Sequence, residues 1–416
     1  MHKTPPGLRF LACSHACPVT AISDVVTASL RTLADAFRNM WRDRIGTDPC
    51  FCLHSGAVMD SVYAFNVQQL PRSSVTAPQA FDFARLYTNI PHAELADTMA
   101  SLITATLAHA QRVAIAVTVT PPKTPDGRRK YEFLVLFRSQ VCSTFIRFGT
   151  FALVRQTCGI PMGISAALFI ANLFLAWFEY WFLTQPAATA QRQRGLHAFD
   201  LTKRYLLDDL LALNNPFITR LLSVDQRYAG LHGLYPASLQ VEAQSHPHLQ
   251  AQLAAGTAAM PFRDILLILR TTPAGHARIT TRLYDKAGCS RCLTVCACPA
   301  SLVRTAKSMK PASARNIFTG QFQRLRRRVV TEVENFAFET ANLITALARM
   351  GYRRPRLLGD LQRMLQRTPE AYYVQRLQRH RPEYADLVGL TRQYLAGRLR
   401  FDSTASPVEL TQSHYW

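Results

Sequence analysis

The segment RYLLDDLLALNN, residues Arg204–Asn215, is the most informative part of the sequence about the fold. Two adjacent acids, Asp208 and Asp209, stand between the apolar runs Tyr205–Leu207 and Leu210–Leu213. This pattern predicts two short strands joined by a tight turn, with the acids at the turn. Carboxylates held between buried strands repel each other unless a cation lies between them, and Mg²⁺ binds carboxylate oxygens together with substrate phosphates. The alternative is a solvated turn, which explains most isolated Asp-Asp pairs.

A further acid lies in another apolar segment. Phe81-Asp82-Phe83 belongs to the strand-like run Ala80–Tyr87, which is followed by Pro91 and a predicted helix over His92–Ala110. If both strands end at the same place, three carboxylates come together. Two metal ions about 4 Å apart could then stabilise an in-line displacement at phosphorus. Taken alone, Asp82 is explained equally simply as a strand-end cap.

A glycine-containing turn precedes the most apolar segment of the chain. Gly159-Ile-Pro-Met-Gly163 opens the run Ile164–Leu183, where glycines allow a ligand to approach the backbone at a helix N-terminus. By itself the motif is only a turn before a helix. Ile164–Leu183 is long enough to span a bilayer, but Asn172 and Glu179 interrupt it. We therefore expect a buried core helix and no membrane partner.

Composition indicates a nucleic-acid partner. The chain has 416 residues, which is room for two or three domains, and its 48% hydrophobic content excludes global disorder. Lys plus Arg number 48 and Asp plus Glu 27, a net charge of +21. An excess of this size favours nucleic acid as the partner, with an anionic membrane second. The first residues contain no apolar signal segment, so we expect an intracellular protein with reduced cysteines.

The remaining segments show recognisable periodicity. The apolar spacing of Thr20–Arg44 predicts an amphipathic helix. Ile265–Arg270 and Ala277–Tyr284 predict a β-hairpin. Beyond residue 300 the chain is basic, and helices are expected over Asn316–Met350 and Leu357–Leu399.

Taken in order, these motifs resemble the palm motifs of reverse transcriptases, and in particular those of Penelope-like elements, a branch related to telomerase. FDFARLYTNIPH (81–92) is similar to the first palm motif, and GIPMG (159–163) matches the glycine–X–proline–methionine–glycine motif of that branch. Residues 204–215 resemble the motif with the two catalytic acids, although Leu206 stands where the family often has Tyr or Phe. The resemblance covers most of the chain but includes no endonuclease domain.

The resemblance implies a right-hand polymerase fold of the α+β class, whose palm contains an antiparallel sheet. The implied regions are partial fingers with their connection to the palm (1–80), the palm (81–299) and a basic helical thumb-like region (300–416). The implied activity is RNA-directed DNA synthesis with two Mg²⁺ or Mn²⁺ ions, an RNA template, a DNA primer and deoxynucleoside triphosphates, and the implied location is the nucleus. The alternative is a decayed, inactive descendant that only binds nucleic acid, because the chain begins almost inside the first fingers motif, which His2-Lys3-Thr4-Pro5 resembles. The sequence does not predict an oligomeric state.

The same resemblance assigns roles to individual residues. Asp82, Asp208 and Asp209 would be the catalytic acids and the metal ligands, and Tyr87 would exclude a ribose 2′-hydroxyl. The nucleotide-binding residues would be Lys3, Arg9, Tyr87, Gln156, Gly159, Pro161, Met162 and Gly163. The nucleic-acid-binding residues would be Arg324, Arg326, Arg327, Arg328, Arg353 and Arg354, unless these arginines only form solvated helix faces.

A cysteine cluster near residue 290 has two interpretations. Cys289, Cys292, Cys296 and Cys298 could bind zinc through thiolates. Their spacing is compressed for a four-ligand site, so reduced thiols in a variable loop are the simpler explanation.

Overall fold

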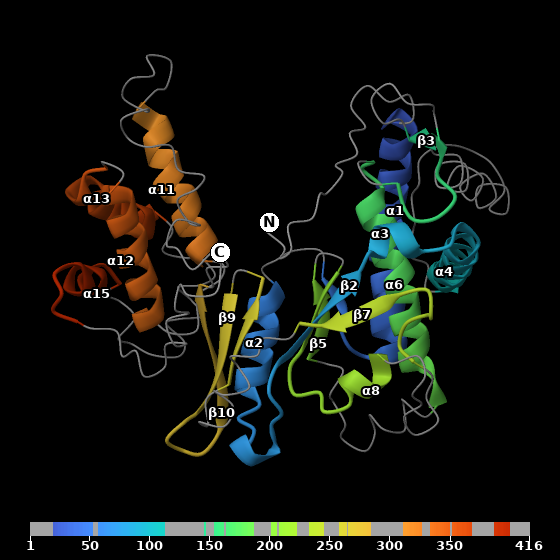
Figure 1. Ribbon diagram of the computed structural model, residues 1–416, viewed down its shortest axis with the longest axis horizontal. Helices are drawn as coiled ribbons and strands as arrows, with labels where there is room; N and C mark the ends of the chain where they lie inside the picture. The colour runs from blue at the N-terminus through green and yellow to red at the C-terminus, as the bar shows by residue number, and fades with distance from the viewer. Residues whose placement is uncertain are drawn as a thin grey trace. The chain divides into compact units, whose positions relative to one another are not determined.

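The protein is described by a computed structural model (Figure 1). The described residues are 20–52, 57–112, 145–146, 154–161, 164–186, 201–205, 208–222, 233–244, 258–263, 265–283, 311–326, 333–349, 352–367 and 387–399. They form a mixed structure of helices and mainly antiparallel sheets. The chain divides into two compact units, residues 1–55 with 81–244 and residues 56–80 with 245–416. The three polymerase regions expected from the sequence stay a prediction.

The first unit is built on a five-stranded sheet. The strand order is β1 (Phe51–Cys52), β5 (Thr202–Tyr205), β6 (Asp209–Ala212), β2 (Gln79–Ala84) and β7 (Gln240–Ala243). β5 pairs antiparallel with β6, and β2 pairs antiparallel with β7, whereas β1 runs parallel to β5. The two antiparallel strands predicted around the Asp-Asp pair are therefore confirmed, but Asp209 is the first residue of β6 and not a turn residue. A separate two-stranded ladder joins β3 (Phe145–Ile146) to β4 (Val154–Arg155).

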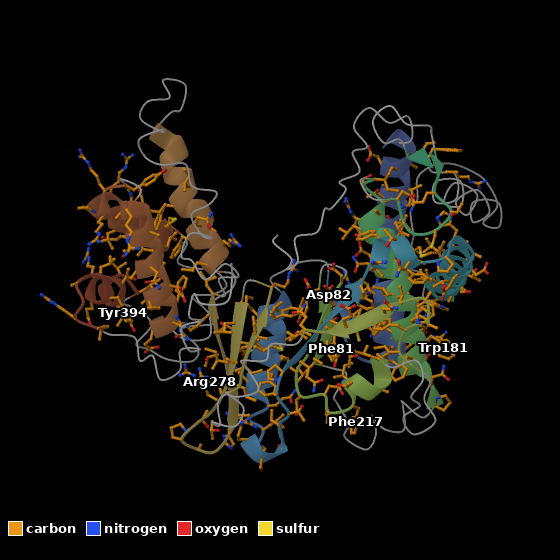
Figure 2. All side chains as sticks on the ribbon, in the orientation of Figure 1. Phe81, Asp82, Trp181, Phe217, Arg278 and Tyr394 are labelled. Atoms are coloured by element: carbon orange, nitrogen blue, oxygen red, sulfur yellow. The ribbon has the colours of Figure 1, made fainter. Side chains whose placement is uncertain are left out.

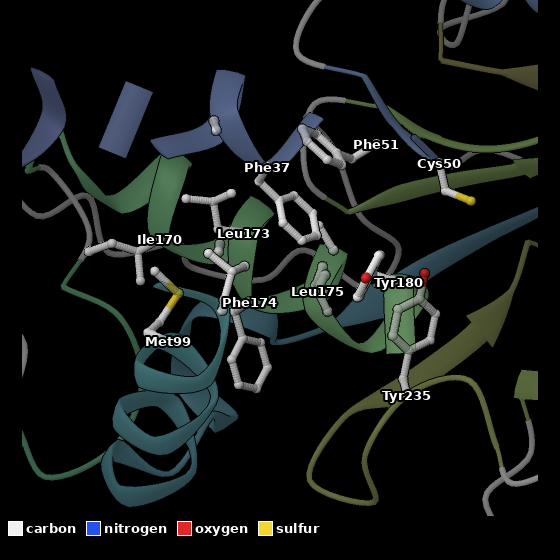
Figure 3. Packing of buried hydrophobic residues seen from close by; sticks show 14 of the residues in the cluster. Phe37, Cys50, Phe51, Met99, Ile170, Leu173, Phe174, Leu175, Tyr180 and Tyr235 are labelled. Atoms are coloured by element: carbon white, nitrogen blue, oxygen red, sulfur yellow. The ribbon is translucent and has the colours of Figure 1, made fainter. Parts of the chain in front are cut away.

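Three long helices supply the core of this unit. They are α1 (Thr20–Ile45), α4 (His92–Arg112) and α6 (Ala167–Thr184), and the short helices α3 (Leu86–Asn89) and α8 (Ile218–Leu222) accompany them. One apolar cluster joins α1, α4 and α6 to the sheet, and Figure 3 shows Phe37 of α1 and Met99 of α4 beside residues of α6. The Phe37 and Tyr180 rings, for example, have centroids 5.6 Å apart.

α6 is the apolar helix predicted from the sequence. It is long and apolar enough to cross a membrane, but 67% of it is buried inside the protein. The expectation of a buried core helix is confirmed for α6. Its burial follows from the packing of α1 and α4 against it, which leaves apolar side chains on most of its circumference away from solvent.

One part of the predicted pattern was wrong. The run Ala80–Tyr87 was expected to be a single strand, but β2 ends at Ala84. Arg85 adopts a left-handed conformation with φ of 54°, which turns the chain into α3. The amides of Thr88 and Asn89 both donate to the Arg85 carbonyl oxygen and close that helical turn. Tyr87 therefore lies on a helical turn next to the sheet and not within a strand.

The second unit contains a three-stranded sheet and a group of helices. β8 (Ala258–Phe262), β9 (Ile265–Thr271) and β10 (Ala277–Leu283) form the antiparallel order β10-β9-β8, which confirms the predicted hairpin. The helices are α2 (Ala57–Val67), the single 3₁₀ turn η1 (Arg72–Ser74), α11 (Pro311–Arg326), α12 (Val333–Arg349), α13 (Arg354–Arg367) and α15 (Leu387–Leu395). The Asn66 side chain joins α2 to β10 by donating to the Ile279 carbonyl oxygen at 2.8 Å and accepting from the Ile279 amide at 2.7 Å. Phe318, Phe322 and Phe336 form the centre of the helical core.

Candidate active site

The sheet brings the predicted acids of two separate motifs together. β6 and β2 are neighbours in the sheet. The amide of Phe83 donates a hydrogen bond to the carbonyl oxygen of Asp208, with an N···O distance of 3.3 Å. Asp82 precedes Phe83 directly, so the backbone of the first acid lies beside the backbone of the Asp208-Asp209 pair.

Side-chain alternation places Asp82 and Asp209 on the same face of the sheet. Phe81 and Phe83 belong to the apolar core of the unit, so Asp82 between them points to the other face. In β6, Leu210 contributes to that core, and the preceding Asp209 therefore also points away from it. Both carboxylate-bearing residues are partly exposed. Figure 2 labels Phe81 and Asp82 on β2.

Tyr87 lies within electrostatic reach of Asp208. Burial, and in second place the negative charge of Asp208, raises the pKa of the Tyr87 hydroxyl to about 12. The ring packs against the apolar core and is half-buried. A rigid ring beside Asp208 is suited to limit what fits next to the acids.

The glycine-containing turn is hydrogen-bonded directly to the segment that carries Tyr87. The Ile160 amide donates to the Tyr87 carbonyl oxygen at 2.7 Å, and the Gly159 amide donates to the Ile90 carbonyl oxygen at 2.7 Å. Nε2 of His92 donates to the Gly159 carbonyl oxygen at 2.9 Å. These three bonds join two motifs that are distant in the sequence into one loop pair.

Gly159 is required by this arrangement. Its φ is +86°, a conformation that side chains other than glycine rarely adopt. A Cβ at Gly159 would also lie 2.8 Å from the Thr88 Cα and still closer to the Tyr87 carbonyl oxygen. A side chain at this position would therefore push the two motifs apart.

The donor set at the acids fits Mg²⁺ or Mn²⁺ in chemical type. Asp82, Asp208 and Asp209 offer only hard carboxylate oxygens. Among the residues that the structure describes, no three Asp, Glu, His or Cys side chains are placed to hold a metal ion by themselves. Mg²⁺ does not need such a cage, because it is commonly held by one or two carboxylates and completed by substrate phosphates and water.

The sequence did not identify one acid next to this site. Glu242 of β7 pairs directly with Asp82 of β2, and paired residues of antiparallel strands point to the same face. Glu242 is exposed. The segment around it lacked a clear periodic pattern, so only the strand register reveals its position.

The other predicted residues fall into three groups. The Gln156 side-chain amide donates to the Cys158 carbonyl oxygen at 2.9 Å, and Pro161 is buried in the same loop. Arg324 and Arg326 are on α11, and Arg353 and Arg354 are exposed at the start of α13, all in the second unit. Outside the described residues lie Lys3, Arg9, Met162, Gly163, Arg327, Arg328, Cys289, Cys292, Cys296 and Cys298.

Comparisons with known proteins give a distant structural likeness. No protein-family model matches the sequence, and no curated protein matches it. Apo telomerase from Candida tropicalis matches with a TM-score of 0.40 at 11% identity, over 92% of this chain and 58% of that one. Telomerase from Candida albicans, in complex with a TWJ fragment of telomeric RNA, matches with a TM-score of 0.36 at 10% identity, over 89% of this chain and 58% of that one. The chain thus spans less than two thirds of the length of these telomerase chains.

Proposed function

We propose that the protein is a reverse-transcriptase-like polymerase of the right-hand type, similar to those of Penelope-like elements. It adds deoxynucleotides to the 3′-hydroxyl of a DNA primer under the direction of an RNA template. The single observation that carries the proposal is the hydrogen bond from the Phe83 amide to the Asp208 carbonyl oxygen. This bond joins the strands of two motifs and brings the backbones of their acids side by side, as a shared reaction centre requires.

The acids define where the reaction takes place. Asp82, Asp208 and Asp209 would hold two Mg²⁺ or Mn²⁺ ions. When bound, such ions activate the 3′-oxygen of the primer and neutralise the charge of the departing pyrophosphate. The role of the carboxylates is to fix the position of that charge, because phosphoryl transfer depends mainly on placement and electrostatic stabilisation.

The loop pair beside the acids would bind the incoming nucleotide. The Tyr87 ring would stand against the sugar and exclude a 2′-hydroxyl by its volume. The Gly159–Gly163 turn and Gln156 would line the nucleotide and template, because the glycine backbone leaves room for a ligand. Lys3 and Arg9 would hold the triphosphate, since both offer charged donors to phosphate oxygens.

The basic helical region would hold the template–primer duplex. Arg353 and Arg354 are exposed at the beginning of α13, together with Arg356. Arg324, Arg326, Arg327 and Arg328 would extend the same function along and beyond α11. Contacts of this kind are to phosphates, so they carry affinity and not sequence preference. A reverse transcriptase with these properties would work in the nucleus.

Primer extension tests the proposal. The full chain is incubated with a DNA primer annealed to an RNA template, deoxynucleoside triphosphates and Mg²⁺ or Mn²⁺. We expect extension by the wild type and none by the Asp208→Asn, Asp209→Asn double variant, which keeps the shape of the turn and removes its charge. Asp35→Asn is the matched control, because it removes a carboxylate from the exposed Arg38–Asp35 pair on α1.

Two results would argue against polymerisation. If wild type and double variant both bind the duplex in a salt-sensitive way and neither extends the primer, the protein is the inactive nucleic-acid binder. If extension persists in the double variant, the acids are not the reaction centre.

A further inference from the structure

Two polar side chains interrupt the apolar helix α6, and both point into the protein. Asn172 and Glu179 are seven residues apart, a spacing that places them on the same face of a helix. Each is only 1% exposed. Polar groups this deeply buried require partners, and both find the same one, Arg204 of β5.

The contacts form a closed polar network. Nε of Arg204 donates to Oε1 of Glu179 at 2.7 Å, and Nη1 donates to Oδ1 of Asn172 at 2.7 Å. Nη2 of Arg204 donates to the Asn172 carbonyl oxygen at 3.0 Å. The Tyr235 hydroxyl donates to the same Oε1 of Glu179 at 2.8 Å. Arg204 is 0% exposed, so its charge is balanced entirely within the protein.

Stability alone is a weak reason for such a network. A buried ion pair loses the hydration of both ions, and well-packed apolar side chains of similar volume are often as stable. What an ion pair with fixed geometry adds is a defined relative position of the elements that carry it, because a guanidinium and a carboxylate bond well only in a few orientations. The network fixes the positions of the elements that its members belong to or contact.

One branch of the network reaches the Asp208-Asp209 turn through β5. The Arg204 amide also donates to the Cys50 carbonyl oxygen at 2.7 Å, which holds β5 in place from its other side. The next residue, Tyr205, is the register partner of Asp209 across the β5–β6 ladder. A shift of Arg204 would therefore move the strand that directly pairs with the second acid.

The other branch reaches the same acids from β2. The Tyr235 ring meets the Phe83 ring edge to face, with centroids 4.8 Å apart and an interplanar angle of 79°. Phe83 follows Asp82 and donates its amide to the Asp208 carbonyl oxygen. One branch therefore ends on β5, which pairs with β6, the strand of Asp209, and the other ends on β2, the strand of Asp82. Both branches start at the Glu179 carboxylate.

We infer that the network of Asn172, Glu179, Arg204 and Tyr235 is a positioning device for the acids. It fixes β5 and β2 against α6, so that Asp82 and the Asp208-Asp209 pair can share divalent cations. None of its members touches the reacting atoms, and they act through the strands. The inference rests on the proposed function, because it assigns the network a role at the same acids.

Mn²⁺ binding to the full chain tests the inference without any need for turnover. Bound Mn²⁺ is measured by electron paramagnetic resonance, first in the wild type and in Asp82→Asn and Asp208→Asn, which identify the signal from the acids. Tyr235→Phe removes only the hydroxyl and keeps the ring on Phe83, and Glu179→Gln removes the charge that faces Arg204. We expect each to weaken acid-dependent Mn²⁺ binding by about tenfold, the lower end of what loss of an outer partner costs a metal site.

The matched control is a polar contact of the same unit without a link to β2 or β5. His109 and Asp43 join α4 to α1 at 2.9 Å. Asp43→Asn should lower the melting temperature but leave the Mn²⁺ affinity at the wild-type value. All variants are measured below their melting temperature, and Tyr235→Phe keeps the test open if Glu179→Gln does not fold.

Three outcomes decide the matter. Wild-type Mn²⁺ affinity in a folded Tyr235→Phe or Glu179→Gln variant would show that the network serves stability alone, and would overturn the inference. A wild-type Mn²⁺ signal that does not depend on Asp82 and Asp208 would overturn it as well. If Mn²⁺ binding behaves as expected but the wild type extends no primer, the inference stands and the proposed polymerase function fails.

Discussion

Gly159 touches the backbone of Tyr87 so closely that no side chain fits between them. The Ile160 amide next to it donates to the Tyr87 carbonyl oxygen, and the left-handed φ of Gly159 brings the turn into this position. The residue proposed to select the sugar and the turn proposed to line the nucleotide are thus one structural piece. A substitution in the Gly159 turn should therefore shift the Tyr87 segment, and the reverse.

Gly159→Ala should destabilise the protein by more than conformation alone explains. A left-handed φ costs a residue with a side chain roughly 1–2 kcal/mol, and the clash with Tyr87 and Thr88 adds to it. Gly46→Ala is the matched control, because Gly46 has a φ of +77° and nothing within 4 Å of a Cβ. Urea unfolding of both variants gives the comparison. Equal losses of unfolding free energy in the two variants would show that the loop pair accommodates the Cβ at Gly159 with no added loss of stability.

Tyr87→Ala should raise the use of ribonucleotides relative to deoxynucleotides by about tenfold or more, because removal of the ring opens a space beside the sugar. Tyr87→Phe should keep the wild-type preference, since the ring and not the hydroxyl supplies the volume. Single-nucleotide incorporation with each substrate measures the ratio. Loss of selectivity in Tyr87→Phe would assign the selection to the hydroxyl.

The protein should lose stability in alkali partly through Tyr87. Its pKa is raised from 10.0 to about 12 in the folded state, so the unfolded chain releases the proton first. The stabilisation is fully present below pH 10 and is lost as the pH rises to about 12. Tyr87→Phe lacks this component, so its unfolding free energy should fall less steeply than that of the wild type over this range. Parallel curves from chemical unfolding at each pH would contradict this.

Glu242→Lys should stabilise the metal-free protein and weaken Mn²⁺ binding. The substitution replaces a like charge directly opposite Asp82 by an opposite one, which is worth about 0.2–1 kcal/mol across a strand pair. The same positive charge repels a cation at the acids. Gln240→Lys is the control, because it adds a lysine to the same strand opposite Ala84. Thermal unfolding and Mn²⁺ titration of both variants separate a local effect at Asp82 from a general effect of charge.

The joint change Arg353→Gln, Arg354→Gln should weaken duplex binding for every sequence. If each arginine contacts one phosphate, the slope of log affinity against log salt concentration should become shallower by about two. The control is Arg38→Gln, Arg42→Gln, which removes the same charge from the ion pairs that these two α1 arginines form with Asp35 and Asp48. Identical salt slopes for the two double variants would mean that α13 does not contact the nucleic acid.

The sequence predicted the helices and hairpins well where the pattern is periodic. α1 and α4 begin and end within two residues of the expected positions, and the β9–β10 hairpin lies where it was expected. The single strand expected over Ala80–Tyr87 was wrong because Arg85 adopts a left-handed conformation that no residue pattern signals. The glycine turn that contacts α3 through the bond from the Ile160 amide to the Tyr87 carbonyl oxygen is distant in the sequence.

The polar interruptions of α6 show the same limit. Asn172 and Glu179 are recognisable in the sequence as unfavourable for a membrane span. The sequence does not reveal that Arg204 is their partner. No local sequence pattern indicates that a buried arginine in a strand pairs with a buried acid in a helix. Glu242 was missed for a similar reason, because its importance comes only from the register between β7 and β2.

Local patterns in the sequence specify which residue types are available for chemistry and which segments form helices or strands, because period and composition act over a few residues. Only the tertiary structure decided that β2 and β6 are neighbours, that Gly159 touches Tyr87, and that Arg204 meets Glu179. These contacts join segments far apart along the chain. Their formation depends on the summed burial of the whole core and on strand register, which no local pattern contains.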